Sequence, residues 1–244
     1  MFKPLAWLTL LLGATCAQAH DEGFHGDVGG MVTGASSMVS GASAQAHALP
    51  YIYGDWGRFY GRVDTFGMRV LPMGQGHLEL AVRVSTEGFE GRKTAYSALA
   101  DRASPVPVGL GTFQRTPLGG VFAYLMHDPQ SGGQFAELNW AVRFALGSAS
   151  VFPQLGVQYR SADYVNHLYG VKAAESVATG LSAYRAGASL MPQAAVHVTL
   201  PLSGPWSLQL QGRYRWLDRA IHDSPLVHER TQTSGVLALT YALD

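Results

Sequence analysis

The sequence predicts an all-β fold, a transmembrane antiparallel β-barrel of 10 or 12 strands. Residues 77–85, 136–146 and 206–215 alternate apolar and polar side chains almost without error. A period of two places alternate side chains on opposite faces of a strand. These runs match the about 9–11 residues that a tilted strand needs to cross a bilayer, whereas strands of soluble domains usually have about 5–6 residues.

The chain start predicts export from the cytoplasm. Residues 1–19 have the pattern of a secretory signal peptide, in which Lys3 is followed by an apolar run and by the cleavage site Ala17-Gln18-Ala19. The mature domain is then residues 20–244. A lipoprotein that carries lipid on Cys16 is the less favoured alternative. Cleavage after Ala19 removes the only cysteine, which excludes disulfides, thiol catalysis and cysteine-bound metals.

Composition agrees with a membrane barrel. Charged residues are 14% of the chain and the net charge is zero, whereas ordinary soluble domains have about 25% charged residues. A neutral chain without a basic run gives no electrostatic argument for nucleic-acid binding. No segment after the signal peptide approaches the about 20 apolar residues of a membrane-spanning helix.

The N-terminal half predicts four strands. Residues 29–37 form a glycine-rich strand and residues 49–55 an aromatic one. A third strand at 59–71 changes phase, and Gly67 at that point suggests a β-bulge. A turn rich in proline and glycine then leads into the alternating strand at 77–85.

A long polar loop at 87–111 separates the two halves. After it, residues 118–126 are apolar on both sides, and residues 134–146 and 151–160 alternate again. The alternation places Leu138 and its even-numbered neighbours opposite the polar odd-numbered positions. Three further strands are therefore expected in this part of the chain.

The C-terminal part predicts the last three strands. They lie at 194–200, 206–215 and 235–243, and a polar stretch at 218–233 precedes the final one. The total is 10 strands, to which the irregular segment 166–190 could add two. An even count is the rule for bacterial single-chain barrels.

Aromatic residues favour a lipid environment. Trp206 and Trp216 bracket one apolar face, as in the girdles of tyrosine and tryptophan at membrane interfaces. We expect a set of apolar side chains on this type of face to contact lipid: Leu80, Val82, Val142, Leu208 and Leu210. The alternative is a soluble periplasmic sandwich that buries the same face against a second sheet.

The polar face holds the only candidate site, a lumen-facing charge network. Its members have both signs, so they can pair across a narrow interior and plug it. The alternative is a polar pore or a ligand-lined channel. The predicted network is Arg62, Asp64, Glu79, Arg83, Glu137, Arg143, Arg160, Arg213 and Arg215.

No constellation predicts catalysis, a cofactor or a metal. The first mature residues, from His20 to Asp27, are rich in histidine and acids and could bind zinc or copper, but a solvated tail has the same composition. His222-Asp223-Ser224 are adjacent residues, which cannot easily face one another as a catalytic triad. Nucleotide-binding and hydrolase motifs are absent. We therefore expect a protein that is not an enzyme, with a hydrolase as the least favoured reading.

Two blocks in the later third resemble a known family. They are Tyr169-Gly170-Val171 followed by Ala173-Ala174-Glu175-Ser176, Gly180 and Tyr184, and then Asp223-Ser224-Pro225-Leu226-Val227. In order and spacing they are similar to the MltA-interacting protein/OmpV family. Two departures are Leu168, where the family has a second tyrosine, and the end at Asp244, where barrels usually have an aromatic residue.

The resemblance implies a barrel of the bacterial outer membrane. The best-studied member is described as a scaffold that joins a lytic transglycosylase to a peptidoglycan synthase, and no catalytic residues are assigned in the family. We therefore expect a structural or scaffolding protein at the cell envelope, whose partners are outer-membrane lipid and periplasmic murein enzymes. The alternative is a small-solute channel. Nucleic acid is not expected as a partner.

Overall fold

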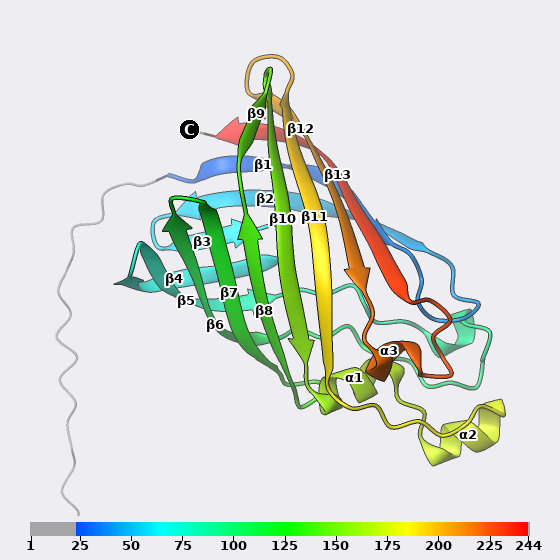
Figure 1. Cartoon of the computed structure of the whole chain (residues 1–244). Helices are drawn as coiled ribbons and strands as arrows, with labels where there is room; N and C mark the ends of the chain where they lie inside the picture. Colours follow the sequence, from blue (N-terminus) through cyan, green and yellow to red (C-terminus); the bar gives the residue numbers. More distant parts are fainter. Residues whose placement is uncertain (1–22, 244) are drawn as a thin grey trace, which may run out of the picture.

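The computed structural model describes residues 23–243, which form a closed antiparallel β-barrel (Figure 1). Strand β1 (His25–Ala35) pairs with β13 (Thr231–Leu243) and closes the wall. The strands between them are β2 (Gln45–Trp56), β3 (Phe59–Arg62), β4 (Thr65–Met73), β5 (Gly76–Arg83), β6 (Val108–Thr116), β7 (Gly119–Asp128), β8 (Gly133–Ala141), β9 (Phe144–Leu146), β10 (Ala149–Arg160), β11 (Ser189–Pro201) and β12 (Trp206–Trp216). The expected signal peptide at 1–19 lies outside the described residues.

The wall has twelve strands because β8 and β9 occupy one position. Both pair with β10, and the short break between them at Val142 and Arg143 faces Pro153. The Val142 N–H donates to the Pro153 carbonyl over 3.1 Å. In an antiparallel ladder the paired residue would donate its own N–H to the Val142 carbonyl. Proline has no N–H, so the pairing is interrupted there. The predicted barrel is confirmed, with the larger of the two expected strand counts.

The prediction of one bulged strand at 59–71 is wrong. These residues form the hairpin of β3 and β4, and Val63 and Asp64 make its turn. Val63 has a φ of 66°, a left-handed conformation that a β-branched residue rarely adopts. The β-bulge is present, but it lies between Arg69 and Leu71 rather than at Gly67.

Two further predictions are corrected. The expected polar loop 87–111 overlaps the start of β6. The inward positions 109 and 111 of this strand are glycines, so the sequence shows no polar side chains alternating with the outward apolar ones. The segment 166–190 supplies no pair of strands. It contributes to two short helices instead, α1 (Ala162–Tyr169) and α2 (Ala173–Thr179).

The outer face is a band of large apolar side chains. Leu80 pairs with Leu110 and Leu210 pairs with Leu237, and all four expose between 39% and 50% of their surface. Of the other residues expected to face lipid, Val82 and Leu208 lie on the same face of their strands. Val142 lies in the break between β8 and β9, where its N–H bonds to Pro153. An outward apolar band of this kind is typical of the lipid-facing surface of outer-membrane barrels.

Aromatic pairs border this band at both ends of the wall. The Trp206 and Tyr241 rings lie 5.2 Å apart at one end, and the Tyr214 and Trp216 rings lie 4.9 Å apart at the other. Such pairs match the interfacial girdles of membrane barrels. No helix among residues 23–243 is long and apolar enough to cross a membrane.

The two ends of the barrel differ in their connections. At one end of the barrel the start of β1 lies beside the end of β13, and five short turns join the other strands there. We call this the turn end. The long connections lie at the opposite, loop end. They are 36–44, 84–107, 161–188 with α1 and α2, and 217–230 with α3 (Arg219–His222); the 84–107 segment also contains the short 3-10 helix Gly91–Lys93. Figure 1 shows all three α-helices gathered at the loop end.

The loop end is covered by a packed hydrophobic cluster, which we call the cap. Val165, Leu168, Ile221 and Leu226 are completely buried there. Hydrogen bonds tie the loops together, since the Ser40 N–H donates to the Leu226 carbonyl over 3.0 Å. The cap is drawn from four connections and comprises mainly Met38, Leu99, Val165, Leu168, Tyr169, Val171, Ile221, Leu226 and Val227.

Candidate functional site

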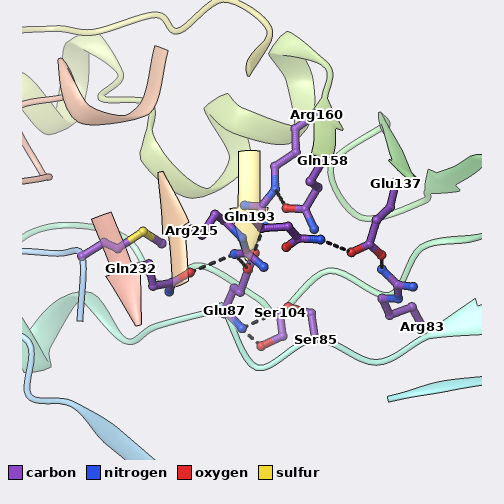
Figure 2. A network of polar contacts seen from close by, with 12 residues as sticks. Arg83, Ser85, Glu87, Ser104, Glu137, Gln158, Arg160, Gln193, Arg215 and Gln232 are labelled. Atoms are coloured by element: carbon purple, nitrogen blue, oxygen red, sulfur yellow. Dashed lines mark hydrogen bonds and ion pairs between the residues drawn. The ribbon is translucent and has the colours of Figure 1, made fainter. Parts of the chain in front are cut away.

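Side chains from six strands and one loop meet inside the barrel, directly below the cap (Figure 2). On one side of the lumen, Arg83 at the end of β5 forms an ion pair with Glu137 on β8. Gln193 on β11 donates through Nε2 to Glu137 Oε1 over 2.7 Å. The guanidinium of Arg83 also lies 5.0 Å from the ring centroids of Tyr124 and Phe135. These contacts link β5, β8 and β11 across the interior.

On the other side, Glu87 joins two arginines. Its Oε1 accepts from Arg160 Nη2 over 2.7 Å and from Arg215 Nη1 over 3.0 Å. Arg160 ends β10, and Arg215 lies one residue before the end of β12. Gln158 and Gln232 satisfy further donors of these arginines, at 2.9 and 2.8 Å. A mostly buried anion shared by two buried cations is therefore the centre of this cluster.

Glu87 belongs to a connection that folds into the barrel. We call residues 84–107, between β5 and β6, the strap. Within it the Phe89 and Arg102 backbones exchange hydrogen bonds of 2.9 and 2.8 Å. Arg102 then forms an ion pair of 2.8 Å with Glu175 on α2. The strap thus leaves β5, crosses the lumen to the wall at β10 and β12, and is fastened to the cap.

Sequence analysis did not place Glu87 in the network. It lies beyond the end of its strand, where the two-residue period that assigns faces no longer applies. The sequence did hold one indication of it. The predicted lumen residues include more arginines than acids, and buried arginines need carboxylate partners, so a further carboxylate was to be expected.

The arginines keep Glu87 ionised despite its burial. Burial alone would raise the pKa of Glu87, but Arg160 and Arg215 outweigh it and lower that pKa from 4.5 to about 2. The carboxylate is therefore charged at any physiological pH.

This depressed pKa predicts how stability responds to acid. Glu87 contributes its full stabilisation above about pH 4.5, and that contribution is lost as the pH falls towards 2. Urea unfolding followed by tryptophan fluorescence should show a loss of stability over this range. Glu87→Gln has no carboxylate to protonate, so its stability should fall less steeply. Equal slopes for the two proteins would contradict the assignment.

Of the other predicted lumen residues, Arg62 belongs to a separate group. Arg62 pairs with Asp55 over 2.6 Å, and Asp55 also accepts from Arg69 over 2.7 Å. Asp64 lies in the β3–β4 turn and is joined to Arg83 through the Thr65 hydroxyl, which donates to Asp64 Oδ1 over 2.9 Å and accepts from Arg83 Nε over 2.9 Å. Asp64 therefore belongs with the Arg83–Glu137 pair at the loop end, whereas Arg62 and Asp55 lie closer to the β2–β3 turn.

Three remaining members have no carboxylate or guanidinium partner within residues 23–243. Glu79 is buried on β5, and Arg213 is partly buried on β12. Arg143 is exposed near the turn end, where its Nη2 donates to Ser150 Oγ over 3.1 Å.

Other candidates considered from the sequence do not assemble into sites. Among the described residues no three His, Cys, Asp or Glu side chains could hold a metal ion. His20, Asp21 and Glu22 lie outside that range. Ser224 Oγ donates to the Tyr169 carbonyl over 2.7 Å, and His222 Nδ1 lies 2.8 Å from Asp223 Oδ1.

The two sequence blocks that carry the family resemblance meet in the cap. Val171 pairs with Tyr184, and Glu175 accepts from Arg102 of the strap. Ser224 of the second block bonds to Tyr169 of the first, and Leu226 is completely buried between them. These motif residues therefore close the loop end.

Comparison with known proteins agrees with this architecture. The family model described as MltA-interacting protein MipA matches residues 28–243. The MltA-interacting protein of Escherichia coli K12 is 31% identical over 131 residues, or 53% of either chain. The chain thus spans about half the length of that relative.

Two outer-membrane proteins are also similar. The putative outer membrane protein YiaT of Escherichia coli K12 is 24% identical over 210 residues, which cover 84% of this chain and 85% of YiaT. Outer membrane protein OmpV of Vibrio cholerae is 29% identical over 133 residues, which cover 54% of this chain and 51% of OmpV. Together with the barrel, these relatives place the chain in the bacterial outer membrane.

Proposed function

Because the chain belongs to the MltA-interacting protein MipA family, we propose that it is a non-enzymatic scaffold of the outer membrane. In this proposal the barrel anchors periplasmic murein enzymes that cleave and synthesise peptidoglycan. The name of the Escherichia coli relative, MltA-interacting protein, supports a murein enzyme as one partner.

The closed loop end is the observation that carries this proposal. The cap and the Glu87 cluster fill the lumen where an open channel would need a passage, since Arg160 and Arg215 are both buried. A barrel obstructed in this way acts through its surfaces rather than through its interior. Ser224 supports the non-enzymatic part, because its hydroxyl is bonded to a backbone carbonyl rather than to a base.

A gated channel for small solutes is the second candidate. Its support is that the closed cluster leaves buried polar atoms without partners, among them Glu87 Oε2, Arg160 Nη1, Gln193 Oε1 and Arg215 Nε. Each unsatisfied buried group costs free energy, about 1–3 kcal/mol. This cost would be recovered if the strap moved and water entered.

Crosslinking in intact cells tests the scaffold proposal. Affinity-tagged protein is crosslinked with formaldehyde and purified under denaturing conditions, and the attached proteins are identified. We expect periplasmic murein hydrolases and synthases, which should be absent from an uncrosslinked sample. Their absence together with measurable uptake of small solutes would contradict the scaffold and favour the channel.

A further inference from the structure

The turns at the turn end and the strand residues beside them carry arginines that pair with no acid among the described residues. These segments are residues 56–59, 71–78, 114–120, 142–150 and 200–207, and none contains aspartate or glutamate. They contain Arg58, Arg115 and Arg143, all exposed. Asp27 of β1 and Asp55 of β2 also lie at this end, where Asp55 is already paired with Arg62 and Arg69. The connections at the loop end, by contrast, mix acids and bases, as in the Glu90–Lys93 pair.

Two of these arginines face the mouth of the lumen rather than the lipid. Arg115 on β6 pairs with Gly120 on β7, and Gly120 pairs with Ala141, which lies on the inward face of β8. Paired residues share one face of the sheet, so Arg115 also points inward. Arg143 bonds to Ser150, a neighbour on the inward face of β10. None of the three arginines forms an ion pair with another described residue.

Aromatic side chains line the same mouth. Phe113 and Phe122 face inward beside Arg115, with ring centroids 4.7 Å apart. Phe152 and His197 lie opposite each other on β10 and β11 at 5.8 Å. Deeper in the barrel, Tyr60 and Tyr124 are buried and fill the lumen. The mouth is therefore a recess with arginines at its rim and apolar rings inside.

We propose that this mouth, defined by Arg58, Arg115, Arg143, Phe113 and Phe122, docks an acidic segment of a periplasmic protein. The proposal rests on the scaffold function above and says where on the barrel the partner binds. Outer-membrane barrels direct their short turns to the periplasm, so the mouth opens on the side of that partner.

Charge and spacing select this occupant. Four strand spacings separate the β2–β3 turn from the β6–β7 turn, about 19 Å along the rim at roughly 4.8 Å each. One small anion cannot bridge Arg58 and Arg115 across that distance, whereas an extended acidic polypeptide can. Lipid headgroups are excluded from Arg115 and Arg143, which lie on the inner face of the wall.

Direct binding tests the mouth without a known partner. The probe is a fluorescent oligoglutamate peptide, titrated against refolded protein in detergent micelles and followed by anisotropy. The variant Arg58→Glu with Arg115→Glu and Arg143→Glu should bind about tenfold more weakly or not at all. The matched control, Arg92→Glu with Lys93→Glu at the loop end, should bind like the unmodified protein.

Foldedness is checked by circular dichroism, and a triple arginine-to-glutamine variant replaces the charge reversal if that protein fails to fold. Equal loss in the loop-end control would overturn the proposal. It would also be overturned by oligoglutamate affinity that the three arginines do not change, or by soluble murein fragments displacing the peptide from the mouth.

Crosslinking in cells separates this inference from the scaffold function. Recovery of murein enzymes with the unmodified protein but not with the triple variant supports the mouth as the docking site. Equal recovery with both proteins would reject the mouth and leave the scaffold standing. If murein enzymes are recovered with neither protein, the scaffold function is rejected. The peptide titration alone would then decide whether the mouth binds acidic polypeptide.

Discussion

Replacing Glu87 by alanine is expected to loosen the loop end and let the barrel conduct. The change leaves the guanidiniums of Arg160 and Arg215 buried without their shared anion. Removing one partner of a buried ion pair costs about 3–5 kcal/mol. The cheapest relief is to hydrate the arginines, which requires the strap to leave the lumen.

Planar-bilayer recording and urea unfolding measure the two consequences. Unmodified protein should show little steady conductance, whereas Glu87→Ala should show either frequent openings or a clear loss of stability. Glu90→Ala is the matched control, because Glu90 lies three residues away in the same strap but pairs only with exposed Arg92 and Lys93. A large, stable current from the unmodified protein would contradict the closed lumen and promote the channel.

Placing arginine at Leu210 is expected to destabilise the barrel by about 2–4 kcal/mol, the cost of a cation on the lipid face near the middle of the membrane. Leu210 lies in the outer apolar band, between Val198 and Leu237 of the neighbouring strands and between the two aromatic girdles. Refolding into lipid bilayers followed by urea titration measures the change in the free energy of unfolding.

The control for this substitution has to be chosen from the structure. Gln209 has the opposite orientation to Leu210, but it is 2% exposed and bonds to Thr199 and Thr240. Arginine there would break buried contacts. Gln211 faces the lumen and is only partly buried, so Gln211→Arg should cost much less than Leu210→Arg. Equal costs at 210 and 211, or a greater cost at 211, would contradict the assignment of the faces.

Sequence periodicity determined the class of fold and the orientation of the regular strands. The run from Trp206 to Arg215 placed Leu208 and Leu210 outside and Arg213 and Arg215 inside, and the register of β12 agrees. This succeeds because each successive residue of a strand points to the opposite face, and because lipid and lumen demand opposite polarity.

Where the period was weak, local pattern was insufficient. The hairpin of β3 and β4 reads as one strand because its turn uses Val63 and Asp64 rather than glycine. Strand β6 was missed because glycine occupies inward positions such as 111, where the ring of Tyr124 from the adjacent strand lies close. Neither feature has a signature in a single sequence.

The site itself was decided by tertiary structure. Sequence showed that Arg83, Glu137, Arg160 and Arg215 face inward, but not that Glu87 from the strap would pair with two of them. Which charges meet depends on the order of strands around the wall and on the path of a long connection. Alternation reports the face of a residue, whereas its partner is set by the closure of the barrel, which brings Arg215 to Glu87 although they lie 128 positions apart in the chain.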